Sequence, residues 1–284
     1  ALQAIWLVHL VLSCYLGARD FALGRMDQYL LLIYRRGLAD GTLNRELALA
    51  YLAHFMLKTK EITGRATDNY RPKPVPSFAS NQYVIVGGSA ADGTDEANEL
   101  SALILEAVTL AAVPQPMVNV RVRGRIPAEL RRAVEAALPT CSSQVQFWND
   151  DRVVPTLTRL GLPEDEACGY ALTACNRADI PGAFSFRAGD AFHNMASWML
   201  ASFDRLPSEP ASLDDLLAAF GAVAREEIWA SVQERSSWLR QSGECFHPES
   251  VLMRDCVARG RDMDDGGLEY PAQYHFLGGV ATVA

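Results

Sequence analysis

The 284-residue sequence contains few of the short motifs that reveal a function. Its six cysteines include no C-x-x-C pair and no Cys/His cluster with zinc-finger spacing, so they predict no zinc module. In a chain of this length they do not suggest a disulfide framework either, and we expect a reducing, cytoplasmic location. No H-E-x-x-H or G-x-S-x-G motif occurs, which leaves no common metalloprotease or serine hydrolase pattern.

Clustered positive charge is also missing. The net charge is -8 and no run of like charges occurs, which argues against a nucleic-acid partner. The apolar stretch at residues 1–20 has no basic start and is interrupted by His9, Ser13 and Cys14. We therefore interpret it as a buried helix rather than a signal peptide or a membrane anchor.

Strand and helix patterns alternate along much of the chain. Tyr83–Val86 is a short continuous apolar run, typical of a strand buried on both faces, and further strands are expected within 115–124 and 142–150. Such alternation predicts parallel strand pairing and an α/β fold. Helices are expected over these ranges: 24–41, 42–62, 95–107, a stretch opening at Pro127, 150–160, 163–171, 190–205, 213–239 and 251–259.

Two local details accompany these helices. In the helix over 42–62 we expect one apolar face, formed by Leu47, Tyr51, Leu52, Phe55 and Met56. For the helix that ends near Ala107, Asp95 is the predicted N-cap, with an apolar stripe formed by Leu100, Leu103, Ile104 and Ala107.

Two segments suggest nucleotide binding without meeting its requirements. "VIVGGSAADG" lies between a strand and a helix but has neither G-x-G-x-x-G nor G-x-x-x-x-G-K-[ST], so a structural glycine turn is favoured. "RVRGR" at residues 121–125 ends a predicted strand. Its charges are expected to face a sheet surface or a cleft rather than RNA.

The turn "YALTACNRADIPG" at residues 170–182 holds the main candidate for chemistry, Cys175. The residues alone leave three interpretations open. Cys175 is a small buried residue at a strand end, or a thiolate nucleophile, or the carrier of a thiyl radical. For the thiolate, Arg177 could lower the thiol pKa, and His193 is the nearest histidine in the sequence.

Five segments, in order, resemble the glycyl-radical enzymes, the family of pyruvate formate-lyase, choline trimethylamine-lyase and glycerol dehydratase. They are "LGRMDQYLLLIYRRGLADG", "VIVGGSAADGTDEANELSALILEA", "QPMVNVRVRGRIPAEL", "FWNDDRVVPTLTRLGLPEDEACGYALTAC" and "GRDMDDGGLEYPAQYHFLGGVATVA". The resemblance implies part of a ten-stranded α/β barrel built from two five-stranded halves, with residues 1–284 as a single partial barrel domain. It places Cys175 at the position of the thiyl radical.

The resemblance also implies a cofactor and partners. The family's radical is stored on a glycine near the C-terminus and is installed by a separate activating enzyme that uses S-adenosylmethionine and an iron–sulfur cluster. No bound metal is expected in the chain itself. The expected partners are a small-molecule substrate and the activating enzyme. A homodimer is compatible with the resemblance, and no membrane partner is expected.

The chain departs from the family at two places. The C-terminal glycine motif, roughly R-V-x-G-[YF], does not occur after the cysteine turn, so we expect this chain to be an internal piece without the glycine-radical domain, inactive by itself. The position that resembles a glutamate base is Arg177, which cannot act as a base. Arg177 is either an ion-pair partner of a carboxylate such as Asp179 or a clamp for an anionic substrate, with Arg187 as a second candidate cation.

The leading hypothesis is therefore a glycyl-radical lyase, dehydratase or formate C-acetyltransferase-like enzyme acting on a small, anionic metabolite. At the positions that resemble the Cys-Cys pair of pyruvate formate-lyase, this chain has Ala174 and Cys175. An acyl relay that uses two adjacent sulfurs is therefore not expected. The alternatives are a thiolate-dependent acyltransferase or hydrolase, and an inactive homologue that serves as a scaffold or binding partner.

Overall fold

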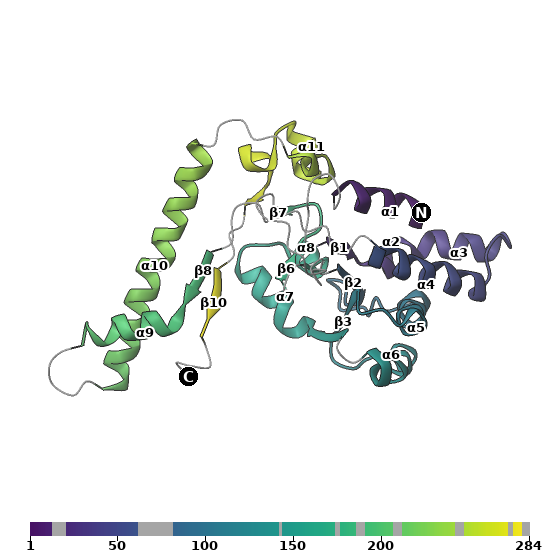
Figure 1. The fold of residues 1–284 in the computed structure, drawn as a ribbon, viewed down its shortest axis with the longest axis horizontal. Coiled ribbons are helices and arrows are strands. Elements are labelled where there is room, and N and C mark those ends of the chain that lie inside the picture. The colour runs from purple at the N-terminus through teal and green to yellow at the C-terminus, as the bar shows by residue number, and fades with distance from the viewer. Residues whose placement is uncertain are drawn as a thin grey trace. The chain divides into compact units, whose positions relative to one another are not determined.

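The computed structural model describes residues 1–12, 21–61, 82–141, 144–173, 177–185, 191–206, 212–241, 247–271 and 275–279 (Figure 1). The chain forms two compact units, one over residues 1–181 and the other over residues 182–284. Each unit is described by itself.

The first unit is built on a parallel four-stranded sheet in the order β1-β2-β3-β4. Its strands are β1 (Phe21–Gly24), β2 (Gln82–Gly87), β3 (Met117–Val122) and β4 (Val145–Asn149). The parallel pairing expected for β2, β3 and β4 is confirmed. The sequence had not indicated β1, which is four residues long and pairs with β2 through an irregular register.

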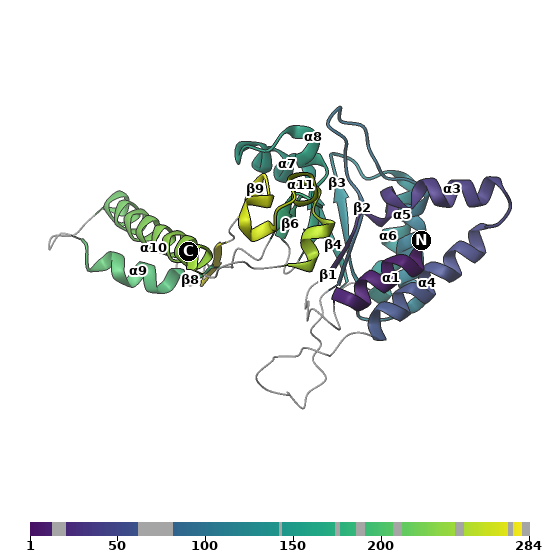
Figure 2. The ribbon, with the colours of Figure 1, turned by 90° about the horizontal axis from the view of Figure 1, so that it is seen from above.

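Helices connect and flank these strands, at positions close to those expected. They are α1 (Leu2–Leu10), α2 (Met26–Tyr29), α3 (Leu31–Ala39), α4 (Arg45–Glu61), α5 (Glu99–Ala111), α6 (Ala128–Cys141), α7 (Asp150–Arg159) and α8 (Glu164–Cys168). In Figure 2, α4, α5 and α6 lie on one side of the sheet, and α7 and α8 lie on the other.

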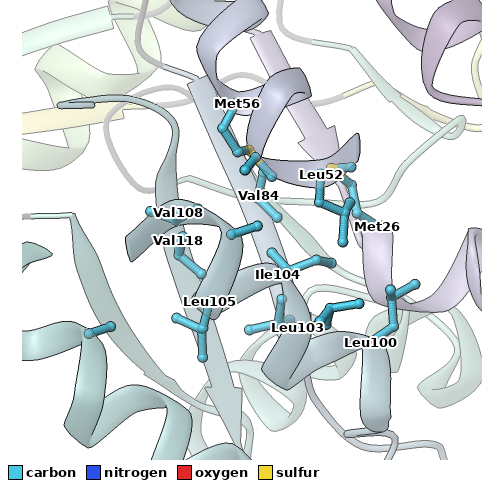
Figure 3. Close-up of a cluster of buried hydrophobic side chains, with 14 of the residues drawn as sticks. Met26, Leu52, Met56, Val84, Leu100, Leu103, Ile104, Leu105, Val108 and Val118 are labelled. Atoms are coloured by element: carbon cyan, nitrogen blue, oxygen red, sulfur yellow. The ribbon is translucent and has the colours of Figure 1, made fainter. Parts of the chain in front are cut away.

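The main core lies between the sheet and the first group of helices. Val84 and Val118 point from the sheet towards α5, whose Ile104 and Leu105 are completely buried (Figure 3). The expected apolar stripe of α5 is confirmed, because Leu100, Leu103, Ile104 and Ala107 are all buried. At roughly 25 cal/mol per Å² of apolar surface, this face supplies much of the driving force for folding.

The opposite face of the sheet is also buried. Tyr83, Ile85, Asn119 and Arg121 alternate with the core valines along β2 and β3, and all four are at most 2% exposed. An antiparallel hairpin, β5 (Ala171–Thr173) and β6 (Arg177–Asp179), belongs to this side, where β5 contacts β1 and β2. The candidate cysteine turn is thus carried by a hairpin on the face of the sheet away from the core helices.

Two sequence expectations about helices were wrong in detail. On α4, Leu47 and Tyr51 are 36% and 53% exposed, and the buried face is formed by Ala48, Leu52, Phe55 and Met56. The pattern was ambiguous because apolar residues occur on several sides of this helix. The N-cap of α5 is Asn98 rather than Asp95, which instead accepts a hydrogen bond from the Ala97 amide before the helix begins.

The helix α1 is buried on one side only. His9 is fully buried and lies 3.0 Å from the Gln82 side chain, and burial lowers the pKa of His9 to about 4. Leu7, Val8 and Val11 are exposed. Among the helices in the described ranges, none has the length and apolar character needed to cross a membrane.

The described part of the second unit contains the later helices, two short strand pairs and two helical turns. The helices predicted near 190–205, 213–239 and 251–259 are present as α9 (Met195–Phe203), α10 (Leu213–Gln241) and α11 (Arg254–Arg259). Strand β7 (Phe184–Ser185) pairs with β9 (Tyr270–Pro271), and β8 (Ala191–Asn194) pairs with β10 (His275–Gly278), both in parallel. A 3-10 turn, η2 (Pro248–Leu252), and a π turn, η3 (Met263–Gly267), flank α11.

Candidate functional site

The hairpin β5–β6 defines the frame of the candidate site. Thr173 pairs with Arg177 across the two strands, so residues 174–176 alone connect them. Cys175, the middle residue of this connection, lies outside the described residues, as does Arg187. The structure has a strand on both sides of this connection.

Arg177 is a buried cation within this hairpin. Its exposed fraction is 8%, and Asp179, two residues further along β6, is 3% exposed. Because side chains alternate along a strand, Arg177 and Asp179 point to the same face as Thr173. The Thr173 hydroxyl donates a hydrogen bond to the Asp179 carboxylate. The residues beside the Cys175 turn therefore form a polar, largely enclosed group.

A second buried charged group lies just before the hairpin. Arg121, at the end of β3, and Asp150, at the start of α7, have completely buried side chains and form an ion pair of 2.8 Å. The Arg121 Nε also donates to Asp150 at 3.1 Å, so the pairing is bidentate. The expectation that the charges of "RVRGR" face a sheet surface is confirmed for Arg121. The sequence did not suggest that this arginine would be buried in an ion pair with Asp150.

Arg121 also binds the backbone that leads into β5. It donates to the carbonyl oxygens of Cys168 and Tyr170, each at 2.8 Å, and its guanidinium lies 3.7 Å from the centre of the Tyr170 ring. The Tyr170 hydroxyl donates to Asp150 at 2.7 Å. Burial raises the pKa of both Tyr170 and the Cys168 thiol, so both stay protonated near neutral pH.

Two glycines make room for this arrangement, as the predicted glycine turn requires. A Cβ added to Gly88 would lie 2.8 Å from the Arg121 Cζ, and a Cβ on Gly87 would lie 2.7 Å from the Arg121 carbonyl oxygen. The backbone φ angle is 73° at Gly87 and 105° at Gly88, and residues other than glycine rarely adopt such positive values. Ser89, the next residue, donates from its amide and its hydroxyl to Asp150.

A third buried group joins two of the family-like segments. Asp27 of "GRMDQ" accepts hydrogen bonds of 2.6 Å from the Gly87 amide and from the Ser101 hydroxyl. Arg25 pairs with Glu96 and also donates to the Gly87 carbonyl at 3.1 Å. Burial is the main influence on Asp27 and raises the pKa of its carboxyl.

The second unit holds two histidine contacts that the sequence did not indicate. His193 Nε2 lies 2.9 Å from His275 Nδ1, and the two rings are stacked. In the parallel pair of β8 and β10, His275 lies opposite Ala191, two residues before His193, so the two histidines are diagonal neighbours on one face. His193 is thus engaged with another histidine. Elsewhere in this unit, His247 Nε2 lies 2.8 Å from an Asp264 carboxylate oxygen. No group of three or more His, Cys, Asp or Glu side chains that could hold a metal ion occurs in the ranges the structure describes.

A cavity of about 500 Å³ lies beside α7. It is lined by Arg123, Asp150, Asp151, Val154, Pro155, Thr158, Leu162 and Glu164. Of the three predicted site residues only Arg177 is described, and it is not among these lining residues. Asp150, the ion-pair partner of Arg121, is among the lining residues, so the cavity adjoins that buried group.

The comparisons with known proteins place the chain in a family. A family model described as pyruvate formate lyase-like matches residues 1–284, and the chain belongs to this family. A probable dehydratase, YbiW, from Escherichia coli strain K12 is 27% identical over 95% of this chain and 36% of its own length. An isethionate sulfite-lyase from Oleidesulfovibrio alaskensis is 26% identical over 61% of this chain and 21% of its own length.

The fold is shared with a solved glycyl-radical enzyme. A crystal structure of a glycyl radical enzyme from Archaeoglobus fulgidus matches 99% of this chain and 38% of its own, with a TM-score of 0.84 and 24% identity. The mixed α/β fold of this chain therefore resembles the barrel domains of glycyl-radical enzymes, and its relatives include dehydratases and lyases. The chain spans little more than a third of the length of the first relative.

Proposed function

We propose that this chain is part of a glycyl-radical lyase or dehydratase, in which Cys175 acts on a small metabolite as a thiyl radical. The observation that carries the proposal is the hairpin β5–β6, which lies on the buried face of a parallel sheet and has Cys175 in its three-residue turn. Arg177 and Asp179, which follow Cys175 in this hairpin, are buried, and an enclosed environment suits a radical that must be kept from water and from side reactions.

The proposed step balances as a hydrogen-atom transfer. The sulfur of Cys175 takes one hydrogen atom from a substrate C–H bond, which leaves the thiol and a carbon-centred substrate radical. After rearrangement or elimination, the product radical takes the hydrogen atom back. Cys175 would first become a thiyl radical by giving its thiol hydrogen atom to a glycyl radical, which a separate activating enzyme would install on a glycine outside this chain.

The larger assembly belongs to the same proposal. We take residues 1–284 as one partial domain of a ten-stranded barrel made of two five-stranded halves, with the glycine-radical domain elsewhere. The parallel sheet with a hairpin on its inner face supports this assignment. Homodimer formation is included as a further expectation. The cytoplasmic location that we propose is compatible with the free thiols of Cys141, Cys168 and Cys256.

The lyase or dehydratase assignment is favoured over a formate C-acetyltransferase. Ala174 precedes Cys175, so the chain has no second adjacent sulfur for an acyl relay. The names of the relatives also favour it, since they are dehydratases and lyases.

A test of the role of Cys175 uses the complete protein that contains this chain, activated under anaerobic conditions. Cys175→Ser should retain the glycyl radical, measured by electron paramagnetic resonance, and should lose substrate turnover by at least about 10³-fold. Cys141→Ser, which alters a buried cysteine of α6, is the matched control and should turn over normally. Turnover by the Cys175→Ser enzyme would overturn the proposal, and failure to form any radical would favour an inactive homologue.

For the substrate, we propose an anion held by Arg177, with Arg187 as a second candidate. Arg177 is a buried guanidinium two residues beyond Cys175, and such a group binds carboxylate or sulfonate oxygens in pairs. One relative is named for isethionate, an anion. A permanent cation here would repel a cationic substrate and attract an acid.

The corresponding prediction concerns affinity. A hydrogen bond to a charged group contributes about 1.5–3 kcal/mol, so Arg177→Ala should weaken substrate binding about 10- to 100-fold. Arg177→Lys should restore only part of the affinity, because the fork geometry is lost. Arg123→Ala, which removes an exposed arginine, is the control. Unchanged affinity in Arg177→Ala, or a neutral substrate, would make Arg177 a structural ion-pair residue.

A further inference from the structure

We propose that Arg121, Asp150 and Tyr170 are positioning residues that fix the β5–β6 hairpin on the sheet and, through it, the place of Cys175. The inference rests on the proposed function of Cys175. It assigns a role in the reaction to three residues that lie before the cysteine in the sequence.

The side-chain contacts of Arg121, which itself lies on β3, are divided between the start of α7 and the chain entering the hairpin. Two of its nitrogens, Nε and Nη2, donate to Asp150 at the start of α7. Nη1 donates to the Tyr170 carbonyl, and Nη2 also donates to the Cys168 carbonyl. Since Tyr170 directly precedes β5, a single side chain from β3 holds the backbone at the point where the hairpin begins.

Asp150 and Tyr170 close the network. Asp150 accepts from the Tyr170 hydroxyl and from the amide and hydroxyl of Ser89, which follows the glycine turn after β2. Asp150, at the start of α7, therefore connects the end of β2, the end of β3 and the residue that precedes the hairpin. A shift of the hairpin along the sheet would break several of these charge-assisted bonds together.

The energetics favour a role in positioning over one in stability. A buried ion pair loses much of its attraction to desolvation, and an apolar set of the same volume often stabilises a fold as well or better. Apolar side chains, however, do not fix the orientation of their neighbours. The planar guanidinium donates in fixed directions, so its carboxylate, its two carbonyl partners and the aromatic ring can be arranged in only one way. A reacting sulfur must be placed to within a fraction of an ångström, and this network supplies that constraint.

The test compares Arg121→Lys and Tyr170→Phe in the complete protein with Arg123→Lys as the matched control. Arg123 lies two residues beyond Arg121, is exposed and pairs with Asp151 at 3.3 Å. Lysine at 121 keeps the charge but loses the fork that reaches both carbonyls. Tyr170→Phe removes one hydroxyl and keeps the ring and the backbone carbonyl, so it serves as the test should Arg121→Lys fail to fold.

The first readout does not depend on activity. Hydrogen exchange of a peptide spanning residues 168–179 should quicken at least tenfold in Arg121→Lys, and to a lesser extent in Tyr170→Phe. A peptide spanning residues 82–87 should keep its protection in both variants, as should both peptides in Arg123→Lys. Unchanged exchange in 168–179 would overturn the inference, whatever Cys175 does.

The second readout separates positioning from binding. In the activated enzyme, kcat should fall about 10- to 100-fold in Arg121→Lys, while KM changes by less than threefold and the radical content stays at the wild-type level. A fall confined to thermal stability, with kcat intact, would reduce the network to a structural role and overturn the inference. The proposed function fails by a different result, which is turnover by Cys175→Ser.

Discussion

At the scale of single residues, the first unit contains buried charges in two different states. Arg121 and Asp150 compensate each other within a bidentate pair. Asp27 has no such compensation at contact distance. Its Oδ2 accepts from Gly87 and Ser101, and its Oδ1 has no hydrogen-bond partner among the described residues. Desolvation therefore dominates and raises the pKa of this carboxyl.

This difference predicts a pH-dependent effect for Asp27→Asn. The folded-state pKa lies above the unfolded value of about 3.8, so the folded protein holds this proton more tightly and loses stability as pH rises from about 4 through the raised pKa. The asparagine has no such titration. The stability of Asp27→Asn relative to wild type should therefore increase across that window, by at most about 1.4 kcal/mol per pH unit, in urea-unfolding midpoints measured from pH 4 to 8.

Asp92→Asn is the control for this experiment. Asp92 is exposed, and the hydrogen bond from the Thr94 amide lowers the pKa of its carboxyl. The stability that Asp92 contributes is present above its unfolded-state pKa and is lost as pH falls through its folded-state pKa. The stability of Asp92→Asn relative to wild type should therefore change with pH only slightly, and in the opposite direction to that of Asp27→Asn. Equal slopes in the two variants would contradict the assignment for Asp27.

At the scale of elements, the start of α5 shows how one helix cap connects separate segments. Asn98 accepts from the Leu100 amide at 2.9 Å, and its own amide donates to the Ser101 hydroxyl oxygen at 3.0 Å, which completes a capping box. The side-chain amide of Asn98 also donates to the carbonyl oxygens of Asp27 and Glu96. This cap therefore connects the start of α5 to α2 and to the loop that leads into α5.

We predict that Asn98→Ala destabilises the protein by about 1–2 kcal/mol, the upper part of the range for N-cap loss, because the contact to Asp27 is lost as well. Asn98→Asp should cost less, since it keeps the acceptor. Both are measured as shifts in the urea-unfolding midpoint. Asp95→Ala, at the cap expected from the sequence, should cost less than about 0.5 kcal/mol. A larger cost at Asp95 than at Asn98 would place the cap where the sequence suggested.

At the scale of the whole molecule, the clusters of buried apolar residues found within the described ranges of the two compact units differ greatly in size. The core of the first unit runs from Leu23 to Val145 and includes 24 buried apolar residues. The cluster around α11 in the second unit consists of Met253, Cys256, Met263 and Leu268. Small cores supply little free energy, so local unfolding in the second unit should occur more readily than in the first.

The prediction is a local effect of Met263→Ala. Truncation of a buried methionine costs about 2–5 kcal/mol, which is large compared with a four-residue cluster. Hydrogen exchange should quicken in residues 247–271 and stay unchanged in residues 82–122. Leu105→Ala, in the core of the first unit, should do the reverse. Uniform loss of protection in either variant would mean that the two units unfold as one.

The fold class was predictable from the order of local patterns. A continuous apolar run at Tyr83–Val86, followed by a glycine turn and a periodic helix, indicates a buried parallel strand with its crossover, and the structure confirms it. The short strand β1 was not predictable. Four residues with a glycine at the end carry too little periodicity to distinguish a strand from a loop.

The candidate site divides in the same way. Cys175 and Arg177 could be found because a motif places them at fixed spacing in one turn, and the role of Cys175 remains a proposal. The contacts among Arg121, Asp150 and Tyr170 could not be found, since Asp150 and Tyr170 are 29 and 49 residues from Arg121 along the sequence and no local pattern pairs them with it.

The sequence by itself determined the α/β order of elements and, through five segments in a characteristic order, the family. Both depend on periodicity and spacing, which are properties of neighbouring residues. Only the tertiary structure decided which charges are buried together. Hydrogen-bond geometry is set by atoms within about 3 Å, and the pairing of Arg121 with Asp150 and the Tyr170 backbone exists only where the ends of β2, β3 and β4 converge beside the hairpin.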